Sequence, residues 1–135
     1  MLFRSASRLN ELAPRLAQMR DRFECGLAGL GATVFGAGAA RIPNTSYFAL
    51  EGIDGETLVV ELDKAGFAVA SGAACSSAST EPSASLLAMG IAPEVARGAV
   101  RVSVGAANTP AEIDAFLATL SATAQRLRQL TAMAV

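Results

Sequence analysis

A chain of 135 residues with a formal net charge of −1 is the size of one domain, and its interspersed charges exclude the basic stripe that nucleic-acid binding requires. Two cysteines and no histidine exclude the common zinc ligand sets and Ser-His-Asp or Cys-His catalysis, and they suit a reducing compartment that disfavours a Cys25–Cys75 disulfide. No apolar run is long enough to span a membrane and no signal peptide is evident, so we expect a cytoplasmic protein without a membrane partner.

The N-terminal part of the chain predicts one long helix. Apolar residues recur at steps of three and four over roughly residues 5–30, which is the spacing of one helical face. They are Leu9, Leu12, Leu16, Met19, Phe23, Leu27 and Leu30. Pro14 should kink this helix or mark its true start. Cys25 falls beside the apolar stripe, where we expect it to pack as a small apolar side chain.

The first five residues differ from the rest of the chain. Met1–Ser5 carries no helix cap, and Leu2–Ser5 is what a common sequencing-adapter end would encode if it were read as coding sequence. We therefore expect that residues 1–5 are not native and that the reading frame is truncated.

Two short strands and a helix are predicted next. Glycines on both sides favour turns around a strand at 33–35, and a second strand is expected at 46–50. Asp54 is a typical N-cap and Gly66 a typical stop for the following helix. Lys64, the only lysine, lies in the last turn of that helix, where we expect it to be solvated rather than to form a Schiff base.

The C-terminal half begins with a strand candidate at 67–70. Short helices are expected to begin at Pro82 and Pro93. Thr109–Glu112 is a capping box with proline at the first helical position, so a last helix should run from there to about residue 130.

Residues 100–104 alternate strictly between valine and polar residues. Three valines should therefore face the core of a strand, while Arg101 and Ser103 project from the opposite face. Apolar residues make up 52% of the chain and aromatic residues only 5%, which indicates close-packed helices with small aliphatic side chains. The sequence predicts a single α+β domain over residues 1–135, with a small mixed or antiparallel sheet of three to four strands and helices packed on one face.

One cysteine lies in a run of small, polar residues that cannot fill a core. No Leu, Ile, Phe or Val occurs between Ala70 and Ser85, and Cys75 stands in the middle of this stretch. An unselected cysteine is more often a buried apolar residue than a nucleophile, but the Ser, Gly and Ala neighbours indicate exposure. We therefore interpret Cys75 as a candidate nucleophile on a loop, and a base from elsewhere must assist it because the chain has no histidine.

Several segments resemble the cysteine desulfurases, which are pyridoxal-phosphate enzymes of the class V aminotransferase group. The resemblance runs from about Leu9 to Leu130, and the Cys75 loop followed by the Arg101 strand is its most specific part. It is carried by residues 41–45, 52–56, 70–77, 81–83, 89–90, 100–105 and 108–109. The Ser-rich loop resembles the group I branch, which serves iron–sulfur cluster assembly and tRNA thiolation. The chain is thus similar to the C-terminal small domain of a fold-type I pyridoxal-phosphate enzyme.

The resemblance implies roles for two residues. Cys75 would attack the sulfur of a cofactor-bound L-cysteine and carry it as a persulfide, with L-alanine as the product. Arg101 would hold the substrate carboxylate in its guanidinium fork. The family's cofactor lysine with its neighbouring histidine, and the rest of the pyridoxal 5'-phosphate site, have no match in this sequence.

It follows that the large cofactor-binding domain is absent, and we expect neither bound cofactor nor desulfurase activity on this chain alone. The resemblance further implies that the intact enzyme is a homodimer and passes sulfur to an acceptor protein, either an iron–sulfur scaffold or a thiolation enzyme.

Two other interpretations stay open. The chain could be a stand-alone binding module that accepts and relays a persulfide without a cofactor, in which case Arg101 would have no substrate to hold. It could also be part of another class V aminotransferase or lyase that keeps the fold but does not use Cys75.

Overall fold

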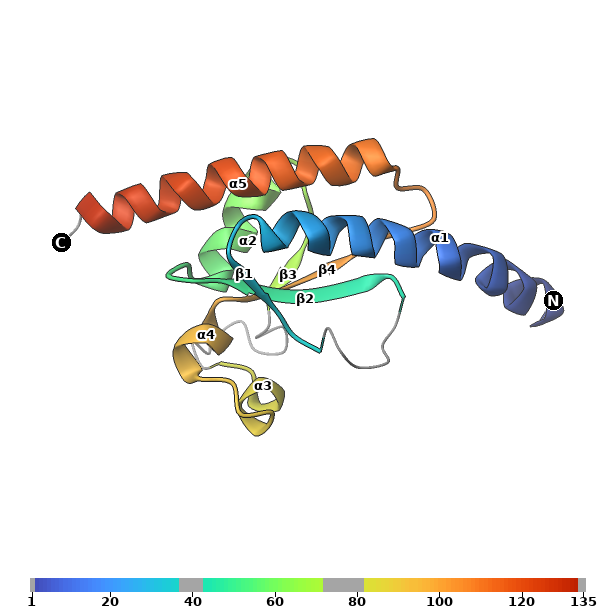
Figure 1. Cartoon of the computed structure of the whole chain (residues 1–135), viewed down its shortest axis with the longest axis horizontal. Coiled ribbons are helices and arrows are strands. Elements are labelled where there is room, and N and C mark those ends of the chain that lie inside the picture. Colours follow the sequence, from blue (N-terminus) through green and yellow to red (C-terminus); the bar gives the residue numbers. More distant parts are fainter. Residues whose placement is uncertain (1, 37–42, 72–81, 134–135) are drawn as a thin grey trace.

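The computed structural model describes residues 2–36, 43–71 and 82–133, with side chains from residue 11 onward. Its elements alternate long helices with short strands (Figure 1). They are α1 (Leu2–Ala28), β1 (Ala32–Val34), β2 (Thr45–Leu50), α2 (Gly55–Lys64), β3 (Ala70–Ser71), α3 (Ala84–Ala88), α4 (Pro93–Arg97), β4 (Ala99–Ser103) and α5 (Pro110–Met133). The four strands form one sheet in the order β1-β2-β4-β3, with every pair antiparallel. The α+β prediction is confirmed.

The three long helices cover one face of the sheet. Helices α1 and α5 lie side by side over it, with α2 beside α5, and the first turns of α1 and the last turns of α5 extend beyond the sheet at opposite ends (Figure 1). Three phenylalanines join the two layers: the Phe23 ring of α1 lies 5.6 Å from Phe48 of β2 and 5.4 Å from Phe116 of α5, measured between ring centroids. Val100 and Val102 of β4 face the same core, as the alternating pattern predicts.

Polar contacts also connect the helical layer. Arg22 of α1 donates two hydrogen bonds to the carboxylate of Asp114 on α5, at 2.8 and 2.6 Å, and this guanidinium holds the pKa of Asp114 below its usual value. The buried hydroxyl of Ser46 on β2 donates to the carboxylate of Glu24 on α1. A buried hydroxyl is stable only with such a partner, so this bond helps to fix α1 over β2.

A second, smaller cluster lies on the opposite face of the sheet. The two short helices α3 and α4 lie below the sheet in Figure 1, and their Leu86 and Ala96 pack with Ala49 of β2 and Ala99 of β4. Phe35, which follows β1, completes this cluster. The short helices thus cover part of the face that the long helices leave open.

Close backbone packing fixes where β4 begins. Gly55, the first residue of α2, is buried, and a Cβ atom there would lie 2.6 Å from the carbonyl oxygen of Ala99. A Cβ atom on Gly98 would lie 2.8 Å from the carbonyl oxygen of Ile53. Only glycine fits at these positions. The close contact between the two backbone segments holds the start of α2 against the junction of α4 and β4.

The N-caps predicted at Asp54 and Thr109 are present, whereas the short helix expected from Pro82 begins at Ala84. The Asp54 carboxylate accepts the amide proton of Thr57 at 2.9 Å, and the Thr109 hydroxyl accepts that of Glu112 at 3.3 Å. Gly66 ends the α2 turn with a φ of 94°, which glycine adopts without strain. Helix α1 runs through Pro14, so this proline does not mark its start.

Two expectations about packing and strand position are wrong. The strand expected at 67–70 begins only at Ala70, because the preceding residues pair with no strand and lie over the core instead. Cys25 is exposed on α1 and free, since the helix turns its side chain away from the buried stripe of Met19, Phe23 and Leu27. Its expected packing role is therefore contradicted.

Candidate functional site

A row of side chains crosses the sheet on the face that carries α3 and α4. Arg101 of β4 pairs directly with Tyr47 of β2 on one side and with Ala70 of β3 on the other. The amide of Phe35 donates to the carbonyl of Tyr47 at 2.7 Å, which extends the row beyond the end of β1. Directly opposed residues of antiparallel strands share one face of the sheet. Phe35, Tyr47, Arg101 and Ala70 therefore form one lateral row, called the Arg101 row below.

The guanidinium of Arg101 has no polar partner within the described part of the chain. Arg101 is exposed and makes neither a hydrogen bond nor an ion pair with another described residue. By contrast, Arg22 and Arg126 bind carboxylates and Arg128 binds a carbonyl oxygen. Among the described residues nothing occupies the five N–H donors of this guanidinium, and its planar geometry suits a carboxylate ligand.

The two neighbouring rows differ in polarity. On one side, Ala49 and Ala99 lie beneath the short helices and close that side with apolar contacts. On the other side, the hydroxyl groups of Thr45 and Ser103 lie 3.3 Å apart and share a hydrogen bond. Arg101 therefore sits at the boundary between a covered apolar region and an open polar one.

The second predicted site residue, Cys75, lies outside the described residues. The strand that precedes Cys75 is nevertheless described. Strand β3 pairs with β4 at Ala70 and Ser71, and the segment with Cys75 follows Ser71 directly. The strand that pairs with β4 at Arg101 thus leads directly into the segment that contains the predicted nucleophile.

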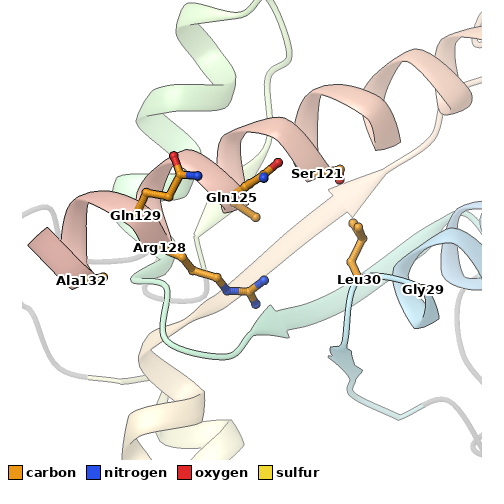
Figure 2. A pocket seen from close by; sticks show the side chains of 8 residues that line it. Gly29, Leu30, Ser121, Gln125, Arg128, Gln129 and Ala132 are labelled. Atoms are coloured by element: carbon orange, nitrogen blue, oxygen red, sulfur yellow. The ribbon is translucent and has the colours of Figure 1, made fainter.

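Two cavities in the described region lie away from the Arg101 row. One, of about 470 Å³, lies between the end of α1 and the second half of α5. Figure 2 shows Ser121, Gln125 and Gln129 on α5 lining it opposite Leu30. The guanidinium of Arg128, in the same wall, donates to the carbonyl oxygen of Glu51 at 3.2 Å. The Arg128 guanidinium therefore already has a partner in the turn between β2 and α2.

The other cavity, of about 380 Å³, is lined by Phe67, Val102 and Phe116 with the polar residues Asn108 and Glu112 at its edge. Those two polar side chains already bond each other at 2.7 Å. In both cavities the charged side chain, Arg128 or Glu112, already has a hydrogen-bond partner.

Within residues 11–36, 43–71 and 82–133, no three or more His, Cys, Asp or Glu side chains are placed to hold a metal ion. No helix of the described chain is both long and apolar enough to span a bilayer.

Comparison with known proteins identifies the family. The model of a family described as aminotransferase class V matches residues 3–116. The chain belongs to the class V aminotransferase family. Its relatives include a cysteine desulfurase of Gluconacetobacter diazotrophicus, 38% identical over 91% of this chain and 31% of that protein. A cysteine desulfurase of Cereibacter sphaeroides is 42% identical over 84% of this chain and 30% of that protein.

The fold comparison agrees with the family. A solved structure titled NifS-like protein superposes with a TM-score of 0.77 at 28% identity, covering 89% of this chain and 30% of the other. The chain therefore spans about a third of the length of the relatives it matches. The resemblance inferred from the sequence motifs is confirmed.

Class V aminotransferases use pyridoxal phosphate, which supplies the electron sink for chemistry at an amino-acid carbon. This chain has no lysine that is suited to form the Schiff base with pyridoxal phosphate. Lys64 is the only lysine, its side chain is 67% exposed, and it donates to Glu61 at 2.8 Å. Lys64 and Arg126 together hold the pKa of the Glu61 carboxyl below its usual value. A solvated, ion-paired ammonium group lacks the desolvation that activates a Schiff-base lysine.

One member of the Arg101 row was missed by sequence reasoning. Tyr47 is the bulky neighbour of Arg101, yet the two residues lie on strands that are far apart in the sequence. The strand at 46–50 was predicted, but no local signal states which strand pairs with it or in which register.

Proposed function

We propose that this chain is the small domain of a cysteine desulfurase, in which Arg101 binds the carboxylate of L-cysteine and Cys75 takes the sulfur as a persulfide. The observation that carries the proposal is the guanidinium of Arg101, which has no polar partner among the described residues and lies beside the strand that leads directly to Cys75. The cysteine desulfurase relatives support the reaction class.

Arg101 contributes binding and orientation. The backbone around it is held between two paired strands, so the base of the side chain is fixed while the guanidinium remains exposed. A bidentate bond to the substrate carboxylate would fix one end of L-cysteine and thereby orient its thiol. Positioning of this kind reduces the barrier because the reacting groups no longer need to be brought together by chance.

Cys75 accepts the sulfur. Cys75 is the fourth residue after Ser71, the paired end of β3, and four residue steps of extended chain span at most about 14 Å. The length of this connection therefore limits how far Cys75 can lie from the Arg101 row. The exchange balances without an external oxidant: a thiol and L-cysteine give a persulfide on Cys75 and L-alanine, as a sulfur–sulfur bond forms and the carbon–sulfur bond of the substrate breaks.

The remaining parts of the reaction belong to other components. Pyridoxal 5'-phosphate and its lysine would be supplied by a large domain outside these 135 residues. The intact enzyme would be a cytoplasmic homodimer that passes sulfur to an acceptor protein for iron–sulfur cluster assembly or tRNA thiolation.

An arginine variant tests the substrate contact. In a chimera where this chain replaces the matching segment of the Gluconacetobacter diazotrophicus relative, we expect Arg101→Lys to raise the KM for L-cysteine by roughly 10- to 100-fold. The reason is that lysine keeps the charge but loses the bidentate fork, and hydrogen bonds to charged groups contribute about 1.5–3 kcal/mol. Steady-state assays of L-alanine release measure the effect.

Arg97→Lys is the matched control, because Arg97 is also exposed and also lacks a polar partner among the described residues, but lies on α4 rather than in the Arg101 row. Its KM should change less than about twofold. Equal KM values for the Arg101→Lys and unmodified chimeras, or an unmodified chimera without activity, would contradict the proposed function.

The isolated chain should be inactive. When purified chain is mixed with pyridoxal phosphate and L-cysteine, we expect no L-alanine above the level of a protein-free mixture, because the only lysine is exposed and ion-paired. Amino-acid analysis of the mixture checks this. Release of L-alanine with a visible cofactor chromophore would show that the chain holds the cofactor without a large domain.

A further inference from the structure

The Arg101 row contains an aromatic ring with no assigned role. Tyr47 stands directly opposite Arg101 across the β2–β4 pair, and Cβ atoms of such pairs are about 4.5–5.5 Å apart. On the β3 side, Arg101 faces Ala70, which offers only a methyl group. Tyr47 is therefore the one bulky side chain directly beside Arg101 on its own sheet face within the described chain.

The Tyr47 ring is itself held in place. On the side away from Arg101 it meets the ring of Phe35 edge-on, with centroids 5.4 Å apart and an interplanar angle of 69°. Phe35 is only 6% exposed and belongs to the cluster under the short helices. Tyr47 is half-buried and packs against the same cluster. Its ring therefore has a fixed support from Phe35, and Arg101 is its direct cross-strand neighbour on the other side.

A rigid neighbouring ring would restrict the rotamers of the Arg101 side chain. Its guanidinium has no hydrogen bond or ion pair with another described residue, so no polar contact there selects one rotamer of its long side chain. Guanidinium planes stack on aromatic faces, and an arginine that is held in place before binding loses less freedom when it binds a carboxylate.

We propose that Tyr47 is a positioning residue for Arg101: its ring, backed by Phe35, forms a wall that holds the guanidinium in the orientation that receives the substrate carboxylate. The inference rests on the proposed function for the identity of the ligand. The proposed contact between the ring and the guanidinium, however, would form in the free protein and can be tested without any reaction.

The first test is side-chain NMR on the full 135-residue chain. The Arg101 Nε–H signal is assigned by its loss in Arg101→Lys, and its order parameter is compared in unmodified, Tyr47→Phe, Tyr47→Leu and Tyr47→Ala chains. We expect the order parameter of Arg101 Nε–H to be the same in the unmodified and Tyr47→Phe chains. In Tyr47→Leu and Tyr47→Ala it should fall by about a third or more, into the flexible range below about 0.6. Tyr47→Leu keeps apolar bulk against Phe35, so it separates loss of the flat ring from loss of folding.

Two outcomes of this NMR test would overturn the proposal. Equal order parameters in all four chains would show that the ring does not hold the guanidinium. A loss in the Phe chain as large as in the Ala chain would assign the effect to the tyrosine hydroxyl instead of the ring. Thr33→Ala is the control, because Thr33 is exposed on β1 and lies outside the Arg101 row. It should leave the Arg101 signal unchanged.

The second test uses the chimera. Tyr47→Leu should raise the KM for L-cysteine about 3- to 10-fold with kcat within about twofold, and Tyr47→Phe should restore the KM. An unchanged KM in Tyr47→Leu, together with a raised KM in Arg101→Lys, would overturn the role of Tyr47 while leaving the proposed function in place. An unchanged KM in Arg101→Lys would instead overturn the proposed function, and the NMR result would still decide whether Tyr47 holds Arg101.

Discussion

Replacing Cys75 by serine should reduce persulfide formation and L-alanine release in the chimera by on the order of 10³-fold or more, since removal of a nucleophile has effects of at least this size. A thiolate is the species that attacks sulfur, and a serine hydroxyl is neither ionised near neutral pH nor able to form a sulfur–sulfur bond. The persulfide is measured by labelling with a thiol-selective reagent and mass spectrometry, and L-alanine by amino-acid analysis.

Cys25→Ser is the matched control for this substitution. Cys25 is the other cysteine of the chain and is exposed and free on α1, in the helical layer on the far side of the sheet from Arg101. Its variant should retain turnover within about twofold. If Cys75→Ser keeps its turnover, or if the persulfide label appears on Cys25, Cys75 is not the sulfur carrier and another class V activity becomes the better interpretation.

Replacing Phe23 by alanine should lower the free energy of unfolding of the isolated chain by about 3–5 kcal/mol. Phe23 is fully buried, and its ring contacts both Phe48 on the sheet and Phe116 on α5, so its removal leaves a cavity where three elements meet. Since domains of this size have about 5–15 kcal/mol of stability, the loss is a large share of the total.

Urea unfolding followed by circular dichroism measures this loss. Leu130→Ala is the control, because Leu130 is 56% exposed near the end of α5 and should change stability by no more than about 0.5 kcal/mol. A Phe23→Ala loss below about 1.5 kcal/mol, with the denaturant dependence unchanged, would mean that the aromatic contacts do not hold α1 and α5 on the sheet.

Much of the fold follows from local patterns. The alternation at residues 100–104 placed the valines in the core and Arg101 on the opposite face, because the side chains of a strand alternate whatever its neighbours are. Asp54 and Thr109 marked helix starts for an equally local reason, namely the unpaired amides of a first helical turn. These signals depend on a few consecutive residues and need no knowledge of the tertiary structure.

The predictions that were wrong or incomplete concern features that depend on contacts between distant segments. Cys25 was placed beside an apolar stripe, but whether the edge of a stripe is covered depends on the crossing of α1 with α5 and the sheet. The strand near residue 70 was expected too early because only the register of β4 decides which residues pair. Tyr47 escaped notice for the same reason: its position beside Arg101 exists only once β2 and β4 are paired.

The strand order also determines when the Arg101 row can form during synthesis. Strand β2 lies next to β4 in the sheet, although α2, β3, α3 and α4 are all made between them. Until β4 leaves the ribosome, β2 can pair only with β1, and its other edge remains an open template for wrong partners. Pairings between distant segments also form slowly. The strand that carries Arg101, the proposed substrate-binding residue, is therefore the last one made, so a nascent chain cannot form the Arg101 row before all four strands are available.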